Sequence, residues 1–191
     1  MIEFLAGEMV YYIDEALPVR VLTNSTYAES LAMWQTAAPL GYEPTDVRRT
    51  NPLHRFYVAA SRVEEFDPDD EESAVDYAFD TLAQVGGSHI WSFVLDAENF
   101  QVYFHSLTNR EIRSLSFEDL DFSCNTPVLM WDLFADDLSG DIADDLFEYS
   151  HDIVLENTLD YLEKREEGLD PALVNELLSG LEAAFRCTEA E

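Results

Sequence analysis

A short polar cluster follows an apolar, β-branched run near the N-terminus. The run covers residues 19–22 and continues into Thr23, Asn24 and Ser25. β-Branched residues favour extended backbone, so the pattern predicts a buried strand over Leu17–Leu22 that carries a small amide to its exposed end. A fixed amide N–H can stabilise negative charge that develops on a reacting oxygen. Asn and Ser are also common turn residues, so an ordinary turn is the alternative interpretation.

Other residue types with catalytic potential do not form a recognisable motif. The histidines lack the i, i+4 spacing of a helical metal site; they are His54, His89, His105 and His151. A nucleophilic pair of Cys124 with a histidine is conceivable, but no segment supplies an oxyanion hole by pattern. The acidic run Asp67–Glu72 lacks the spaced aspartates of a calcium loop and is typical of a solvated helix cap. We therefore expect no metal and no other cofactor.

The charge of the chain excludes several classes of partner. The chain has 40 acidic and 10 basic residues. Residues 1–62 hold 7 of the acidic and 5 of the basic residues, and residues 63–191 hold the other 33 acidic and 5 basic residues. A nucleic-acid surface needs a basic patch, and anionic membranes repel an acidic protein. Neither partner is expected. Such acidity fits either a salt-adapted protein or an ordinary acidic one, because screening salt relieves self-repulsion.

The apolar content of 47% in 191 residues indicates one domain with a sizeable core. No apolar run is long enough to cross a bilayer, and no basic segment followed by an apolar one marks a signal peptide. The two cysteines, Cys124 and Cys187, are too few for a disulfide framework and lack zinc-site spacing. This low number of cysteines fits a reducing, cytoplasmic location.

The pattern of apolar residues predicts the elements that must position Asn24. Alternation and turn residues predict a hairpin over residues 2–13 and a β region over residues 90–116. Helical spacing predicts helices over residues 26–38, 53–66 and 71–85, the first capped by Ser25 or Thr26. Residues 39–52 are typical of a loop.

The composition changes after residue 131, where the chain becomes more acidic. Apolar residues from Ile142 to Leu162 indicate one amphipathic helix, and Asp170-Pro171 opens another. We therefore expect two parts, residues 1–131 and an acidic helical extension over residues 132–191 packed on the first.

Three short motifs occur in a recognisable order: Leu22-Thr23-Asn24, Arg55-Phe56, and an aromatic hairpin that opens with Trp91-Ser92. In this order, residues 2–131 resemble the C-terminal portion of the choloylglycine hydrolase, or linear amide C–N hydrolase, family. That family includes conjugated bile acid hydrolases and penicillin V acylases. The resemblance implies an α+β fold, namely the C-terminal half of the αββα sandwich of N-terminal-nucleophile (Ntn) hydrolases.

The resemblance also implies an activity and its residues. Small acyl amides, such as bile salt conjugates, penicillin V or N-acyl signalling compounds, would be the substrates. Asn24 would donate a hydrogen bond near the nucleophile or the oxyanion, and Arg55 would lower the pKa of a nearby thiol. Thr23 and Trp91 are weaker candidates for substrate binding. A surface salt bridge for Arg55 and a core position for Trp91 are the structural alternatives.

One feature of the family is missing from this sequence. Its nucleophile is an N-terminal cysteine whose own α-amine acts as the base, whereas removal of Met1 here would expose Ile2. The sequence therefore predicts a chain that supplies Asn24 and Arg55 to a site completed by a missing N-terminal half, with homo-oligomers possible and no turnover by the chain alone. A non-catalytic acidic binding domain derived from the same fold is the alternative.

Overall fold

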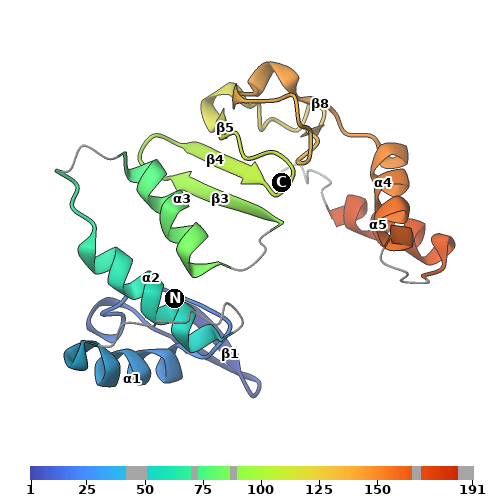
Figure 1. Ribbon diagram of the computed structural model, residues 1–191. Helices are drawn as coiled ribbons and strands as arrows, with labels where there is room; N and C mark the ends of the chain where they lie inside the picture. Colours follow the sequence, from blue (N-terminus) through green and yellow to red (C-terminus); the bar gives the residue numbers. More distant parts are fainter. Residues whose placement is uncertain (42–50, 70–72, 87–89, 165–168, 185–191) are drawn as a thin grey trace.

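The structure is a computed structural model that describes residues 1–41, 51–69, 73–86, 90–164 and 169–184. It is a mixed α+β fold. Figure 1 shows the N-terminal hairpin with α1 and α2 at one end, α3 beside β3 and β4 in the middle, and α4 with α5 beyond β8. The strands are β1 (Ile2–Leu5), β2 (Glu8–Tyr11), β3 (Trp91–Asp96), β4 (Gln101–Ser106), β5 (Arg113–Ser116), β6 (Leu129–Met130), β7 (Gly140–Asp141) and β8 (Phe147–Glu148). The α-helices are α1 (Tyr27–Ala37), α2 (Pro52–Glu65), α3 (Ala74–Val85), α4 (His151–Lys164) and α5 (Pro171–Ala184).

The predicted N-terminal hairpin is confirmed, since β1 and β2 pair antiparallel. Its two-residue turn places Ala6 at φ 51° and Gly7 at φ 88°, the left-handed geometry that matches the twist of a hairpin. The exposed face of this hairpin is apolar and carries Ile2, Phe4, Met9 and Tyr11.

The predicted helices over residues 26–38, 53–66 and 71–85 are confirmed with small shifts at their ends. Thr26 caps α1, because its Oγ1 accepts from the Glu29 N–H. Pro52 occupies the first turn of α2 and Asn51 caps it. These are favoured residues at helix starts, where N–H groups lack partners within the helix. Most of the predicted loop over residues 39–52 lies outside the described residues.

The main sheet has the order β3-β4-β5-β7. The first three strands form the antiparallel β region predicted over residues 90–116, and β7 adds in parallel to β5. The side chain of Arg113 is fully buried on this sheet. Its guanidinium lies 4.9 Å from the Phe104 ring and its Nη1 donates to the Leu133 carbonyl at 2.9 Å.

Two predicted elements are wrong. Residues 17–22 pair with no other strand of the described chain. The helix predicted to start at Ile142 starts only at His151, because residues 140–148 form β7, a 3₁₀ turn and β8 instead. Ile142 is fully buried and its N–H donates to the Ser114 carbonyl at 3.1 Å. Its apolar character thus reflects burial beside the sheet.

The helices α4 and α5 form a pair that is joined by side-chain hydrogen bonds. His151 contacts both Glu182 (2.6 Å) and Asn175 (2.9 Å) of α5. The hydroxyl of Tyr149 donates to the same Glu182 oxygen at 2.6 Å. None of the described helices has the length and apolarity that a membrane span requires.

Candidate active site at the start of helix α2

Two of the predicted site residues meet directly. Arg55, in the first turn of α2, donates from Nη1 to the side-chain oxygen of Asn24 at 3.1 Å. Asn24 lies in the loop between the extended segment and α1, 31 positions earlier in the chain. The fold therefore brings the amide and the guanidinium to one place, although no local pattern connects them.

This hydrogen bond fixes the orientation of the Asn24 amide. A guanidinium has only donors, so the atom that faces Arg55 must be the amide oxygen, Oδ1. The Nδ2 group then points its N–H bonds elsewhere, and Asn24 is exposed. An oriented, accessible N–H donor is the group that an oxyanion site requires.

A second hydrogen bond ties the same loop to α2. The Thr23 hydroxyl donates to the Pro52 carbonyl at 3.0 Å. The Asn51 side chain accepts from the Leu53 N–H and so caps the helix at this point. Thr23 therefore holds the loop that carries Asn24 against the helix start. A contact of Thr23 with substrate stays a prediction.

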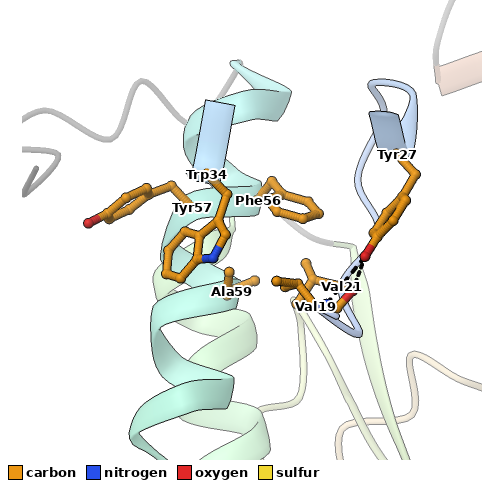
Figure 2. Close-up of a cluster of buried hydrophobic side chains, with 8 residues drawn as sticks. Val19, Val21, Tyr27, Trp34, Phe56, Tyr57 and Ala59 are labelled. Atoms are coloured by element: carbon orange, nitrogen blue, oxygen red, sulfur yellow. Dashed lines mark hydrogen bonds between the residues drawn. The ribbon is translucent and has the colours of Figure 1, made fainter. Parts of the chain in front are cut away.

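Both segments rest on one buried cluster, shown in Figure 2. Phe56, the residue after Arg55, is fully buried, as is Tyr27 of α1. The Tyr27 hydroxyl donates to the Val19 carbonyl at 2.8 Å and accepts from the Val19 N–H at 3.3 Å. The cluster comprises Val19, Val21, Tyr27, Trp34, Phe56, Tyr57, Ala59 and Ala60. It anchors the segments that carry Asn24 and Arg55, so the pair lies directly above a packed hydrophobic cluster.

The side-chain partners of Arg55 differ from those of Arg62 and Lys164. In the part of the chain that the structure describes, Arg62 pairs with Asp80 and Lys164 with Asp160, whereas Arg55 pairs with no carboxylate. Its Nε is buried and has no hydrogen-bond partner among the described residues. The positive end of the α2 dipole lies beside it. A thiol placed here would be stabilised as thiolate, because nearby positive charge lowers a thiol pKa.

Trp91 does not join this group. It begins β3, is 52% exposed, and packs edge-on against Phe93 with ring centroids 5.3 Å apart. No described contact connects it to Asn24 or Arg55. The structure therefore assembles Thr23, Asn24 and Arg55 and leaves Trp91 exposed at the start of β3.

The other candidate nucleophile is not available as a thiol. Cys124 is disulfide-bonded, so the alternative Cys–His pair has no free sulfur at this position. Cys187 and His89 lie outside the described residues. Within the described ranges, no group of three or more His, Cys, Asp or Glu side chains could hold a metal ion.

One polar cluster was not foreseen from the sequence. His151, Glu182, Asn175 and Tyr149 meet where α4 and α5 pack. Hydrogen bonds from Asn175 and Glu182 raise the pKa of His151, and those from Tyr149 and His151 lower the pKa of Glu182. Because these residues belong to two segments that are more than 20 residues apart, no spacing in the sequence reveals the cluster.

Comparison with known proteins identifies the class of fold. No protein-family profile matches the sequence, and no curated protein matches it. Among solved structures, the fold is similar to that of an acylase. That structure is penicillin V acylase from Agrobacterium tumefaciens, with a TM-score of 0.61 and 22% sequence identity over 78% of this chain. This chain spans 52% of that acylase, about half its length.

Proposed function

We propose that this chain supplies Asn24 and Arg55 to the active site of a hydrolase that cleaves linear amide C–N bonds of small acyl amides. The direct hydrogen bond between these two side chains carries the proposal. The similarity to penicillin V acylase supports it at the level of the fold. Because the chain spans only half of that acylase, we infer that a cysteine nucleophile comes from a further polypeptide segment.

In the proposed reaction, the thiolate of this cysteine adds to the carbonyl carbon of the substrate amide, and the carbonyl oxygen becomes an oxyanion. The Asn24 Nδ2–H donates to that oxygen, and Arg55 favours the thiolate before attack. When the intermediate collapses, the C–N bond breaks and the leaving amine takes the proton that the cysteine's α-amine removed from the thiol. Water then hydrolyses the thioester, which releases the acid and restores the thiol.

The coding sequence upstream of Met1 tests this proposal. We expect an in-frame Met-Cys start about 150 residues earlier, which is half of a domain of this size class. The protein containing both segments should hydrolyse penicillin V or a glycine-conjugated bile salt, and the 191-residue chain alone should not. Turnover by the chain alone, or an upstream region without a cysteine start, would overturn the proposal.

The alternative is a non-catalytic acidic binding domain. The packed cluster beneath Asn24 and Arg55 favours it, because a chain with its own core can fold alone. A monomeric sample of the chain with one cooperative thermal transition would support this alternative. An aggregated or molten sample would support a half-enzyme, because its apolar sheet faces then need a partner.

A further inference from the structure

A cavity of about 290 Å³ lies beside the strands β5, β6 and β8. Its wall is formed by β5, by the loop over residues 120–128, by β6 and the residue that follows it closely, and by the residue before β8. The volume is near the lower end of the range for small-ligand sites. The lining residues are Leu115, Leu120, Asp121, Phe122, Ser123, Thr126, Pro127, Val128, Leu129, Trp131 and Leu146.

The wall of this cavity is mostly apolar and includes two aromatic rings, Phe122 and Trp131. Phe122 is 75% exposed and Val128 is 59% exposed, although both are large apolar side chains. Exposed apolar side chains that gather around a hollow are typical of a binding surface. An aromatic face also attracts a cation through the negative charge of its ring electrons.

Among the described residues, one charged group lines the cavity, the carboxylate of Asp121. It accepts from the Thr126 hydroxyl at 2.6 Å and from the Ser123 N–H at 2.8 Å. These hydrogen bonds, with that from Thr126 contributing most, lower the pKa of Asp121, so the group is ionised at neutral pH. The ion pairs among the described residues do not include Asp121. The cavity therefore carries a negative charge that no described cation neutralises.

The loop that carries Asp121 is held in position by several contacts. The hydroxyls of Ser123 and Thr126 lie 3.0 Å apart, and Cys124 is disulfide-bonded. At the end of the loop, the Val128 carbonyl accepts from the Tyr149 N–H at 2.7 Å. A site that is ordered before binding loses less conformational entropy when it takes up a ligand.

We propose that this cavity binds a small apolar organic cation, of the class of alkyl- and arylammonium ions. The apolar part of the ligand lies against the leucine side chains of the wall, and the ammonium group lies near the aromatic rings and Asp121. An anionic ligand is repelled by Asp121 and by the formal net charge of −30. The lining contains neither Asn24 nor Arg55, so this inference does not depend on the proposed function.

Calorimetric titration of the 191-residue chain with hexyltrimethylammonium tests the proposal. The titration uses about 1 M KCl, because salt screens weak association with the exposed acidic surface more than binding in a partly buried site. We expect saturable binding at a single site, with a Kd of about 1 mM or lower. The anion hexanoate should not bind, and neutral 1-hexanol should bind about tenfold more weakly.

Two results of this titration would overturn the proposal. One is the absence of binding by hexyltrimethylammonium, and the other is equally strong binding by hexanoate. Residues outside the described ranges that filled the cavity would exclude the probe, so the first result also covers that case.

A pair of variants separates the charge in the cavity from the charge of the whole chain. Asp121→Asn and Asp136→Asn each remove one negative charge, but Asp136 is exposed and lies outside the lining. We expect Asp121→Asn to weaken binding about tenfold and Asp136→Asn to weaken it less than about twofold. The thermal transition of each variant verifies folding. Equal weakening by both variants would show a general charge effect and overturn the proposal.

Two further measurements locate the bound cation. Leu146→Trp places a larger side chain in the wall and should abolish binding while Asp121 stays in place. In the native chain, the NMR signal of the Trp131 indole N–H, assigned by its loss in Trp131→Phe, should shift during the titration. Binding that leaves this signal unchanged, or that persists in folded Leu146→Trp, would mean that the cation binds elsewhere and would overturn the proposal.

Discussion

The guanidinium of Arg55 and the side-chain oxygen of Asn24 are joined by a 3.1 Å hydrogen bond between the first turn of α2 and the loop before α1. This contact gives each residue a defined role. Arg55 orients the amide, and the amide presents its N–H donors. Each role can be removed separately by substitution.

The role of the Asn24 donor is tested by Asn24→Asp. The aspartate keeps an acceptor for Arg55 but has no N–H to offer an oxyanion. In the enzyme that contains both segments, we expect kcat to fall about 10²- to 10³-fold, as for loss of one oxyanion donor. Ser25→Ala is the neighbouring control and should retain activity. If Asn24→Asp kept full activity, the amide would not be the oxyanion donor.

The role of Arg55 is tested by Arg55→Gln, with Arg110→Gln as a control that removes the same charge from an exposed position. Loss of the cation beside the nucleophile should raise the thiol pKa. The pH dependence of inactivation by iodoacetamide in the two-segment enzyme should therefore move to higher pH in Arg55→Gln only. An equal shift in Arg110→Gln would show a general charge effect.

The packing beneath Asn24 and Arg55 depends on the Tyr27 hydroxyl. Tyr27→Phe would leave the N–H and C=O of Val19 without a partner in a buried position. Such loss costs about 1–3 kcal/mol, so the free energy of unfolding and the melting temperature should fall. Tyr11→Phe, at a 63% exposed position, should change stability little. Chemical denaturation of both variants makes the comparison.

The α4–α5 pair should respond to pH through His151 and Glu182. The raised pKa of His151 adds stability that is complete below its ordinary value of 6.5 and is lost as the pH rises through the folded-state pKa. The lowered pKa of Glu182 adds stability above its ordinary value of 4.5 that is lost as the pH falls through its folded-state pKa.

The contact should therefore be strongest between these two ordinary values and weaken towards alkaline pH. Thermal unfolding followed across this range should show the loss in the native chain. In His151→Gln the alkaline loss should disappear. A parallel pH profile in both proteins would show that His151 does not stabilise the helix pair.

A salt dependence follows from the net charge of −30. If the acidity marks a salt-adapted protein, the melting temperature should rise in about 1 M KCl, where charges are screened within a few ångströms. Sucrose at an equal osmolality is the uncharged control, because it also favours compact states. A melting temperature that is insensitive to KCl would remove this hypothesis.

The sequence predicted most elements because they are determined by local signals. The hairpin, α1, α2, α3 and the three antiparallel strands have their own caps, turns and periodicities. The predicted strand over Leu17–Leu22 was wrong in its pairing but right in its burial. The alternation of apolar and polar residues around Val19 and Val21 indicates which side chains are buried. A β-strand also requires backbone pairing with a second strand, which this alternation does not predict.

The site was only partly accessible from the sequence. Asn24 and Arg55 were selected through a family resemblance, and their contact depends on packing between segments that lie far apart in the chain. The exposure of Trp91 and the cluster at His151 depend on tertiary structure in the same way.

The parallel pairing of β5 with β7 sets an order of assembly for the main sheet. The strands β3, β4 and β5 follow one another through short turns, so their ladders can form early and at low entropic cost. The strand β7 pairs only after the intervening residues 117–139 have closed a long loop, which Arg113 holds through the Leu133 carbonyl. We expect this border of the sheet to form last during refolding and to open first under denaturing stress.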